Sequence, residues 1–426
     1  MTGYQQALGV ILDAARPLAA EPCRTVDALG RITAGPVTSN EDLPPFDNSA
    51  MDGFALHAGG QTLAAGTSFE VAGSQSAGDA HQRAGSGAWE IMTGARMPDG
   101  LDTVVPVEQV EILQRDAGGR PSRIQLTVDV EPGRHVRKRG EDVRRDATIM
   151  AAGTLMQAQH LMLLAGLGIS EVAVVRRPRV ALINTGRELV DDPAQPLASG
   201  QIRNSNGPFL ATRLAAAGAE LVYRQTVNDE PQAFHAALAA ARQAGAEVVI
   251  STGAVSMGRH DFIPDALRVI GAEIGFHKVK IRPGRPLLFA RLVDGMLFFG
   301  LPGNPVSSAV GLRFFVEPAL RKMLGLPPER PLRLPLAQDF SKKAGLRFHL
   351  KGQVHCDAGG RLQARVLQGQ ESFRIQPMLA SNAWVVVDED VASLQAGELV
   401  DVHGPGHLQA VSISAGPDEI LLPEEA

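Results

Sequence analysis

The sequence predicts a multidomain protein in which a central open α/β domain is combined with β domains. The chain has 426 residues and 44% hydrophobic content, and single hydrophobic cores stop growing at about 250–300 residues. Apolar runs alternate with helical stretches between residues 178 and 325, which is typical of a sheet covered by helices. Short strand-like runs separated by turn residues dominate the regions on both sides.

The N-terminal third begins with a helix and then becomes β-rich. Leu8, Ile11, Leu12 and Ala15 have the i, i+3, i+4, i+7 spacing of an amphipathic helix, which Pro17 helps to end. The strand-like runs that follow are SFEVAG, AWEIMTG, TVVPVEQVEIL and RIQLTVDV. Helical spacing returns at residues 154–166, so the chain leaves a helical segment, builds a β domain and comes back.

The α/β region contains four expected parallel strands, VALINTG, LVYRQTV, VVISTG and MLFFGLPGNP. The expected helices are PFLATRLAAAG, PQAFHAALAAARQAG, PDALRVIG and VSSAVGLRFFVEPALRKMLG. Asp229 is expected to cap the second of these helices, with Pro231 in its first turn and Gly245 after its end. After the linker Pro327-Pro328, short runs from PLRLPLAQDF to LQAVSI predict a small β-barrel or sandwich.

Composition excludes several classes of protein. The net charge of −5 gives no global basic field for nucleic acid or acidic membranes. The N-terminus lacks a basic n-region with an apolar core, and no window has 18 consecutive apolar residues, so we expect a cytoplasmic protein. The two cysteines, Cys23 and Cys356, exclude a disulfide scaffold and a four-cysteine zinc site.

Small and polar residues follow three of the expected strands, where ligands bind in open α/β sheets. Glycines there let backbone N–H groups approach a ligand, and a helix N-terminus favours an anion, so a phosphate-bearing ligand is expected. The residues of these strand ends are Thr185, Gly186, Ser251, Gly253, Ser256, Gly258, Pro302, Gly303, Asn304, Pro305 and Ser307.

Three acids, Glu188, Asp229 and Asp261, also follow expected strands. Mg²⁺ is held by one or two carboxylates together with substrate phosphates, so these acids indicate a magnesium–nucleotide site. Taken singly, each has an ordinary structural explanation as a helix cap, a loop acid or a helix start. Their joint appearance favours the metal site.

A basic segment, residues 275–286, contains Lys278, Lys280, Arg282 and Arg285. Such a run is either a solvated face or a site that holds an oxyanion by charge-assisted hydrogen bonds, and the sequence favours neither. Residues 133–145 are also basic, but they lack the interleaved aromatic residues typical of nucleic-acid binding.

Several motifs together resemble a known family. The segment PPFDNSAMDGFAL at residues 44–56 sets Asp52 between turn-forming residues. This segment is followed along the chain by six others: IMTGARMP, GRHVRKRGEDV, INTGREL, STGAVSMGRHDF, IRPGRP and GLPGNPVS. Their order resembles that in molybdopterin molybdenumtransferases. These enzymes finish molybdenum cofactor synthesis and resemble the gephyrin E domain. The resemblance extends over nearly the whole chain.

The resemblance implies four domains and an elongated homodimer with its site shared between subunits. The domains would be a discontinuous helical domain (1–40 and 141–177), an inserted β domain (41–140), a molybdopterin-binding α/β domain (178–325) and a C-terminal β domain (326–426). The implied reaction is Mg²⁺-dependent cleavage of adenylylated molybdopterin, with insertion of molybdate and release of AMP.

The resemblance also implies roles for individual residues. Asp52, Thr93 and Asp142 match functional positions, and Asp52 would meet Glu188, Asp229 and Asp261 of a partner subunit around metal and phosphate. Lys278, Arg282, Arg285 and Arg347 would neutralise the anionic substrates, and Ser307 would donate a hydrogen bond.

The chain departs from the family pattern at several positions. Arg187 replaces an acid, Ala254 replaces a glycine, and Gln376-Pro377 stands where a serine pair is usual. The last departure makes Lys351 an alternative to Arg347. The nearest alternative functions are a molybdopterin adenylyltransferase, which has the same α/β fold, and a non-catalytic gephyrin-like scaffold that binds other proteins.

Overall fold

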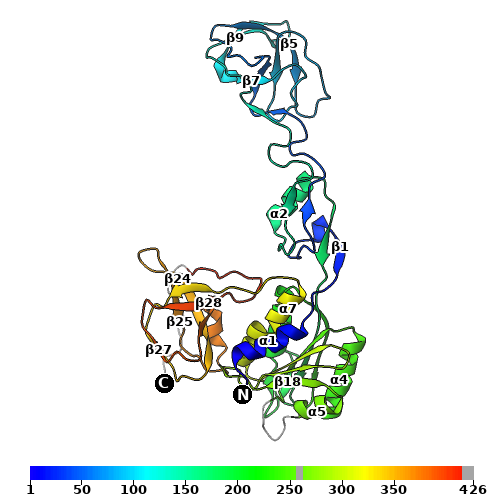
Figure 1. Ribbon diagram of the computed structural model, residues 1–426, viewed down its shortest axis with the longest axis vertical. Coiled ribbons are helices and arrows are strands. Elements are labelled where there is room, and N and C mark those ends of the chain that lie inside the picture. The colour runs from blue at the N-terminus through cyan, green and yellow to red at the C-terminus, as the bar shows by residue number, and fades with distance from the viewer. Residues whose placement is uncertain (256–261, 415–426) are drawn as a thin grey trace. The chain divides into compact units, whose positions relative to one another are not determined.

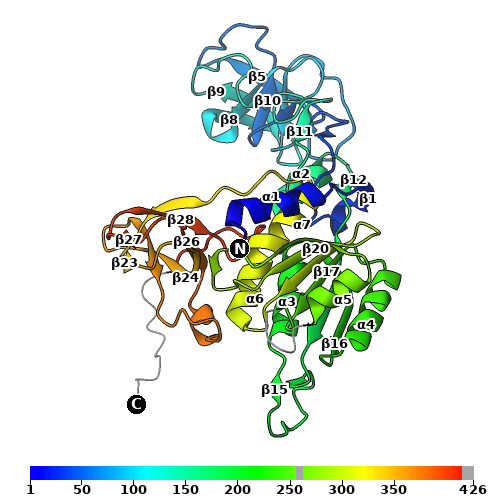
Figure 2. The same ribbon diagram turned by 60° about the horizontal axis from the view of Figure 1, so that its bottom comes forward.

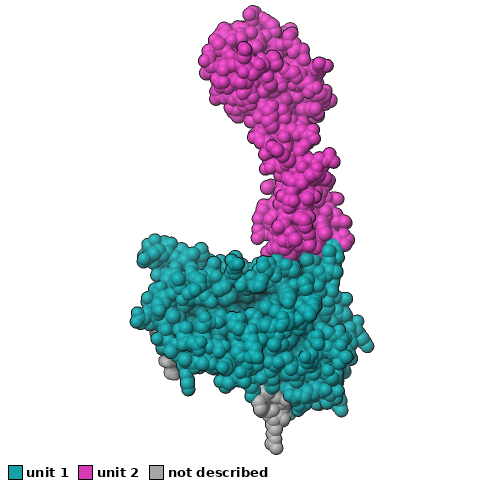
Figure 3. Space-filling view, in the orientation of Figure 1, with its two compact units in different colours: residues 1–21, 175–426 teal, residues 22–174 magenta. Residues whose placement is uncertain are grey.

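The computed structural model describes residues 1–255 and 262–414. The chain divides into two compact units, which Figure 3 colours separately. Unit 1 contains residues 1–21 and 175–426, and unit 2 contains residues 22–174. The chain passes between the units along strands β1 (Ala20–Arg24) and β12 (Glu171–Val175), which pair with each other.

A six-stranded sheet forms the centre of unit 1, in the order β16-β13-β17-β21-β20-β18. The four strands expected from the sequence are adjacent and parallel: β16 (Glu220–Val227), β13 (Arg179–Thr185), β17 (Val248–Thr252) and β21 (Leu297–Leu301). Every residue of β17 and β21 is buried, which explains their continuous apolar runs. Two further strands, which the sequence did not predict, run antiparallel at one edge of the sheet: β20 (Leu288–Arg291) and β18 (Glu273–His277).

Helices cover both faces of this sheet (Figures 1 and 2). One face packs against α4 (Pro231–Gln243) and α5 (Ile263–Val269) through residues such as Phe234 and Leu267. The other packs against α1, α3, α6 and α7, in a core that includes Ile11, Leu210 and Phe315. Their bounds are α1 (Tyr4–Ala14), α3 (Asn206–Ala216), α6 (Pro305–Gly311), a π-helical turn (Leu312–Val316) and α7 (Glu317–Met323).

The C-terminal part of unit 1 is a β domain around a second six-stranded sheet, in the order β19-β24-β26-β28-β22, with β25 paired to β24. Its strands are β19 (Ile281–Arg282), β22 (Leu332–Pro335), β24 (Arg347–Cys356), β25 (Leu362–Val366), β26 (Ala383–Val387) and β28 (Leu399–His403). Two short strands, β23 (Phe340–Ser341) and β27 (Ser393–Leu394), form a separate pair. The strand expected at LQAVSI is absent, since residues 408–413 carry no strand.

The basic segment joins the two sheets of unit 1. It leaves β18 of the central sheet and enters β19, which pairs in parallel with β24 of the C-terminal sheet. Ile281 pairs with Arg347 and Arg282 with Phe348. The segment is therefore held by backbone pairing in both sheets of unit 1.

Unit 2 is built around a six-stranded sheet in the order β7-β4-β6-β5-β9-β8. The strands are β4 (Gly53–Leu56), β5 (Ser68–Gln75), β6 (Ala88–Ile91), β7 (Thr103–Pro106), β8 (Val110–Arg115) and β9 (Pro121–Leu126). Two small pairs accompany it, β3 (Asn48–Ser49) with β10 (Val136–Arg137) and β2 (Val37–Thr38) with β11 (Thr148–Met150). Helix α2 (Ala158–Gly166) begins four residues later than the helical spacing suggests.

Helix α1 belongs to unit 1 because Tyr4, Ala7 and Ile11 are buried in the core of the α/β domain. This differs from the expected division, in which residues 1–40 and 141–177 form one domain. No helix within residues 1–255 and 262–414 has the length and apolar character of a membrane span.

Candidate functional site

A cleft of about 430 Å³ lies at the carboxyl ends of the central parallel strands. Six of the residues expected from the sequence line it: Thr185, Glu188, Gly253, Pro302, Gly303 and Asn304. Seven further residues, which the sequence did not predict to bind a ligand, complete the lining: Leu189, Ile202, Asn206, Thr252, Ala254, Val255 and Pro286. The cleft therefore joins the ends of β13, β17 and β21, as the strand-end argument predicts.

Gly253 is required by the close packing of two strand ends in this cleft. Its φ of +88° is a conformation that favours glycine. A Cβ atom placed there would lie 2.5 Å from the Thr185 carbonyl oxygen, which cannot move without shifting β13. Ala254, which replaces a family glycine, has φ of +50° and so bears a strain of about 1–2 kcal/mol.

Glu188 follows β13 and folds back over Gly186, where a Cβ atom would lie 2.8 Å from its carboxylate oxygens. Asp229 contacts the same turn, since its Oδ2 accepts a hydrogen bond from the Arg187 N–H at 3.4 Å. The expected capping role of Asp229 is wrong, because Glu230 occupies the N-cap of α4 and makes no side-chain cap. Asp229 is thus directed to the strand end of β13.

Hydrogen bonds fix the loop between β21 and α6. The Asn206 amide at the start of α3 donates to the Gly303 carbonyl at 2.7 Å. Asn304 donates from its amide to the Ser372 hydroxyl at 3.0 Å, and the Ser372 carbonyl accepts from the Val306 N–H at 3.0 Å. These bonds connect the cleft to the C-terminal domain of unit 1.

The basic residues of unit 1 differ in how they are held. Arg282 and Arg285 are exposed, and the Arg282 guanidinium lies 5.4 Å from the centre of the Phe348 ring. Lys278 has φ of +76°, and its backbone N–H donates to the Leu287 carbonyl. Since Pro286 lines the cleft, the segment reaches the site directly after Arg285.

In unit 2, Asp52 and Thr93 form a second polar group. The Asp52 carboxylate accepts hydrogen bonds from the Thr93 N–H at 2.6 Å and from the Thr93 hydroxyl at 2.8 Å. These bonds lower the pKa of Asp52. Asp142 is also exposed in this unit, and its N–H donates to the Leu43 carbonyl.

Comparison with known proteins decides the family. Three family models match in order: "MoeA N-terminal region (domain I and II)" at residues 2–168, "Probable molybdopterin binding domain" at residues 181–322, and "MoeA C-terminal region (domain IV)" at residues 333–404. A molybdopterin molybdenumtransferase of Synechococcus elongatus is 34% identical over 94% of this chain and 98% of its own length. The chain belongs to the molybdopterin molybdenumtransferase family.

Other members of the family agree. The molybdopterin molybdenumtransferase of Haemophilus influenzae is 32% identical over 92% of this chain and 95% of its own. The solved structure of the molybdopterin biosynthesis moeA protein from Pyrococcus horikoshii OT3 superimposes with a TM-score of 0.77 at 27% identity, covering 94% of this chain and 99% of that one. The multidomain fold with its C-terminal β domain, and a transferase role in molybdenum cofactor synthesis, follow from this membership.

The family resemblance also suggested Arg347, which lies elsewhere in unit 1. Arg347 forms an ion pair with Asp388, and its guanidinium lies 4.7 Å from the centre of the Tyr4 ring. It is not among the residues that line the cleft. Burial lowers its pKa.

The alternative, Lys351, is fully buried and holds a loop that touches the cleft. Its Nζ donates to the carbonyls of Gly369, Glu371 and Arg374 at 2.5–3.4 Å. Ser372, within this loop, is the residue that contacts Asn304. Burial lowers the pKa of Lys351 to about 8.

The remaining family positions are placed as follows. Pro305 begins α6, and Ser307 is buried within that helix. Ser251 is fully buried in β17, and its hydroxyl has no hydrogen-bond partner among the described residues. Ser256, Gly258 and Asp261 lie outside the described residues.

The resemblance to the family implies a magnesium ion beside the carboxylates of the cleft. In the part of the chain that the structure describes, no group of three His, Cys, Asp or Glu residues could hold a metal ion. Mg²⁺ needs only one or two carboxylates when phosphates and water supply the other ligands. Glu188 in the cleft and Asp229 beside it fit that smaller donor set.

Proposed function

We propose that the protein inserts molybdenum from molybdate into molybdopterin that arrives as its adenylylated form, with Mg²⁺-dependent release of AMP. The observation that carries the proposal is the cleft at the ends of β13, β17 and β21, which is rimmed by glycines and small residues. Backbone N–H groups at such strand ends bind phosphates without side-chain bulk. The cleft volume of about 430 Å³ suits a small-molecule ligand.

The cleft would bind the diphosphate between its glycine rim and its acids. Gly303 has open space on its side-chain face for a phosphate, Gly253 lets the ends of β13 and β17 pack closely beneath the cleft, and Glu188 with Asp229 would hold the magnesium ion. A bound Mg²⁺ would supply charge neutralisation at the phosphates. Phosphate-bond cleavage of this kind depends more on positioning and charge than on covalent catalysis.

The basic segment would balance the remaining negative charge. Molybdate and the diphosphate are both anions, and Arg282 and Arg285 are exposed cations on a segment that is held by pairing in β19 and by the hydrogen bond from the Val279 N–H to the Arg285 carbonyl. Together with Lys278, they would hold these anions by charge-assisted hydrogen bonds.

We further propose a homodimer in which each site draws on two copies of the chain. Asp52 and Thr93 lie in unit 2, whereas the cleft lies in unit 1. The exposed Asp52 carboxylate makes its described hydrogen bonds only with Thr93, so one edge of it is open to a ligand. In this proposal a partner copy presents Asp52 to the cleft that holds Glu188.

The reaction itself is the test. Purified protein is incubated with adenylylated molybdopterin, molybdate and Mg²⁺, and AMP is measured by chromatography. AMP release that needs both molybdate and Mg²⁺ supports the proposal. Release of pyrophosphate from ATP with molybdopterin would instead indicate an adenylyltransferase, and no turnover of either kind would favour a scaffold.

A matched pair of variants tests the metal-binding role. Glu188→Gln keeps the size of the side chain and removes its charge, so AMP release should fall about 100-fold and need more Mg²⁺. Asp192→Asn changes an exposed acid four residues later, which caps its own loop through the Ala194 N–H. It should leave both quantities unchanged, and equal effects of the two substitutions would remove Glu188 from the metal site.

A further inference from the structure

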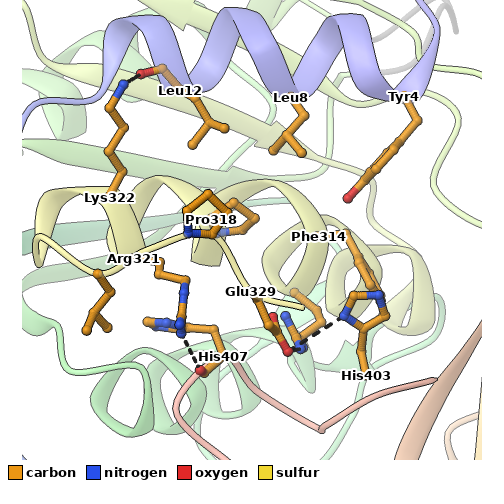
Figure 4. Close-up of a pocket in the computed structure, with 13 residues that line it drawn as sticks. Tyr4, Leu8, Leu12, Phe314, Pro318, Arg321, Lys322, Glu329, His403 and His407 are labelled. Carbon is orange, nitrogen blue, oxygen red and sulfur yellow. Dashed lines mark hydrogen bonds and ion pairs between the residues drawn. The ribbon is translucent and has the colours of Figure 1, made fainter. Parts of the chain in front are cut away.

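A second cavity, of about 400 Å³, lies in unit 1 and shares no lining residue with the cleft. Figure 4 shows it between helix α1, helix α7 with the π-helical turn before it, and the ends of the C-terminal domain. Its volume is within the range of small-molecule sites, about 300–1,000 Å³.

The walls of this cavity are largely apolar. Leu8 and Leu12 of α1 face Pro318 of α7 across it (Figure 4). Phe314, Leu326 and Pro328 complete the apolar lining. Such walls favour a ligand with a flat or branched hydrocarbon body.

The one carboxylate in the lining already has its partners. Glu329 lies 2.6 Å from the Arg313 guanidinium and 3.6 Å from Nδ1 of His403. Burial raises the pKa of Glu329, but hydrogen bonds from His403 and Arg313 outweigh this and lower it to about 2. The Glu329 carboxylate is therefore charged and already paired with cationic side chains, so it gives no reason to expect a cationic ligand.

Two cations in the lining lack such a partner. Among the described residues, Arg321 donates only to the carbonyls of Pro327 and His407, and Lys322 donates to the carbonyl of Leu12. Burial lowers the pKa of Arg321; Glu329 opposes this effect and Arg313 adds to it. Arg321 and Lys322 are half-buried, and a cation held only by neutral oxygens gains from a ligand that brings a negative charge.

Tyr4 provides a polar group that is aimed into the cavity. Its side chain is 8% exposed, and Figure 4 shows its hydroxyl directed toward the cavity floor. The ring is fixed by edge contact with Phe315 and by the Arg347 guanidinium. Within the described residues the hydroxyl has no hydrogen-bond partner, and its oxygen faces the open space of the cavity, where a polar atom of a ligand can pair with it.

We infer that this cavity is a binding site for a small amphipathic carboxylate. The carboxylate of the ligand would lie toward Arg321 and Lys322, and its apolar body would pack between Leu8 and Phe314. The Tyr4 hydroxyl would donate to a polar atom of the ligand. The site is separate from the cleft, so the inference does not rest on the proposed function.

Binding of two probes of opposite charge tests the inference on the full-length protein. Calorimetric titration with 2-naphthoate should give saturable binding with a Kd below about 1 mM, and 2-naphthylmethylammonium should bind at least about tenfold more weakly. If the ammonium probe binds as tightly, or if naphthoate does not saturate, the inference is wrong. This comparison needs no variant.

Three variants locate the binding. Leu8→Trp fills the cavity and should abolish naphthoate binding, and Arg321→Gln should weaken it about tenfold. Arg330→Gln is the matched control, because Arg330 is exposed and does not line the cavity. Unchanged binding by Leu8→Trp would place the probe elsewhere and overturn the inference.

Each variant is first checked by its thermal midpoint, because Arg321 also holds two backbone carbonyls. If Arg321→Gln is unfolded, Tyr4→Phe takes its place, since it removes only the hydroxyl. Naphthoate affinity should then fall about threefold to tenfold. An affinity equal to that of the unmodified protein would contradict the role of Tyr4 in the site.

Discussion

Asp52 and Thr93 are 41 residues apart in the chain and are joined by two hydrogen bonds to one carboxylate oxygen. The Thr93 N–H lies 2.6 Å from Oδ1 of Asp52 and the Thr93 hydroxyl lies 2.8 Å from the same atom. Both bonds favour the ionised acid and lower its pKa. A carboxylate held in this way is oriented and charged at neutral pH while it stays exposed.

Asp52→Asn should slow AMP release without loss of folding. The substitution removes the charge, and the exposed position means that packing changes little. We expect a fall of about 100-fold in AMP release, with the thermal midpoint unchanged. The matched control is Asp116→Asn, because Asp116 is also an exposed acid of unit 2 that accepts backbone N–H groups. Comparable losses in both variants would show that Asp52 has no special role.

Gly253→Ala should damage the cleft, whereas Gly303→Ala should be accommodated. The new methyl group at residue 253 would lie 2.5 Å from the Thr185 carbonyl oxygen in a backbone conformation that favours glycine. At residue 303 the nearest atom is Cα of Gly253 at 3.9 Å, an ordinary contact. We expect the first variant to lose about 2 kcal/mol of stability and the second less than about 0.5 kcal/mol. Equal thermal midpoints would contradict the described strand packing.

Stability of unit 1 should fall as the pH is lowered from about 6.5 to 4. Burial lowers the pKa of His407 to about 4, with a smaller opposing effect from its hydrogen bond to the Ala217 carbonyl. The unfolded chain takes up a proton near pH 6.5, and the folded chain does so only near pH 4. Protonation therefore stabilises the unfolded state relative to the folded state between pH 6.5 and pH 4. The free energy of unfolding is lower by about 3 kcal/mol at pH 4.

The variant His407→Gln should lose part of this pH dependence, about 2 kcal/mol between pH 7 and pH 4.5. The two tryptophans lie in different units, so a Trp89→Phe background leaves Trp384 to report on unit 1 in urea titrations. His57→Gln is the control, because His57 is exposed. Identical pH dependence with and without His407 would show that this histidine is not buried in its neutral form.

Much of the fold could be predicted because burial leaves a local pattern. The runs VALIN and VVIST are continuous because both faces of β13 and β17 are covered, and α4 shows its buried Phe234 and Leu238 at helical spacing. The sequence did not predict strands β18 and β20, because each has only four or five residues. They flank the basic segment, and β18 overlaps its start, so charged residues interrupt the apolar pattern there. LQAVSI has the pattern of a strand, but Gly406 and Gln409 pair across a tight turn at its start.

The site was predictable in part for a similar reason. Glycines and acids at strand ends stand out in the sequence, and Thr185, Glu188 and Gly303 do line the cleft. Asn206 gives no signal, because an asparagine at a helix start usually caps that helix, whereas here its amide bonds the Gly303 carbonyl. The pairing of Arg347 with Tyr4, 343 residues away (347 − 4), depends on tertiary packing that local patterns do not contain.

A mixed dimer gives the most direct test of the shared site. One copy carries Asp52→Asn, the other carries Glu188→Gln, and two different tags allow the mixed dimer to be purified. Each variant alone should be nearly inactive in AMP release. If the site draws Asp52 from one copy and Glu188 from the other, the mixed dimer contains one intact site of two and should recover about half of the unmodified rate. A mixed dimer as inactive as its parents, or a chain that forms no dimer, would contradict the account.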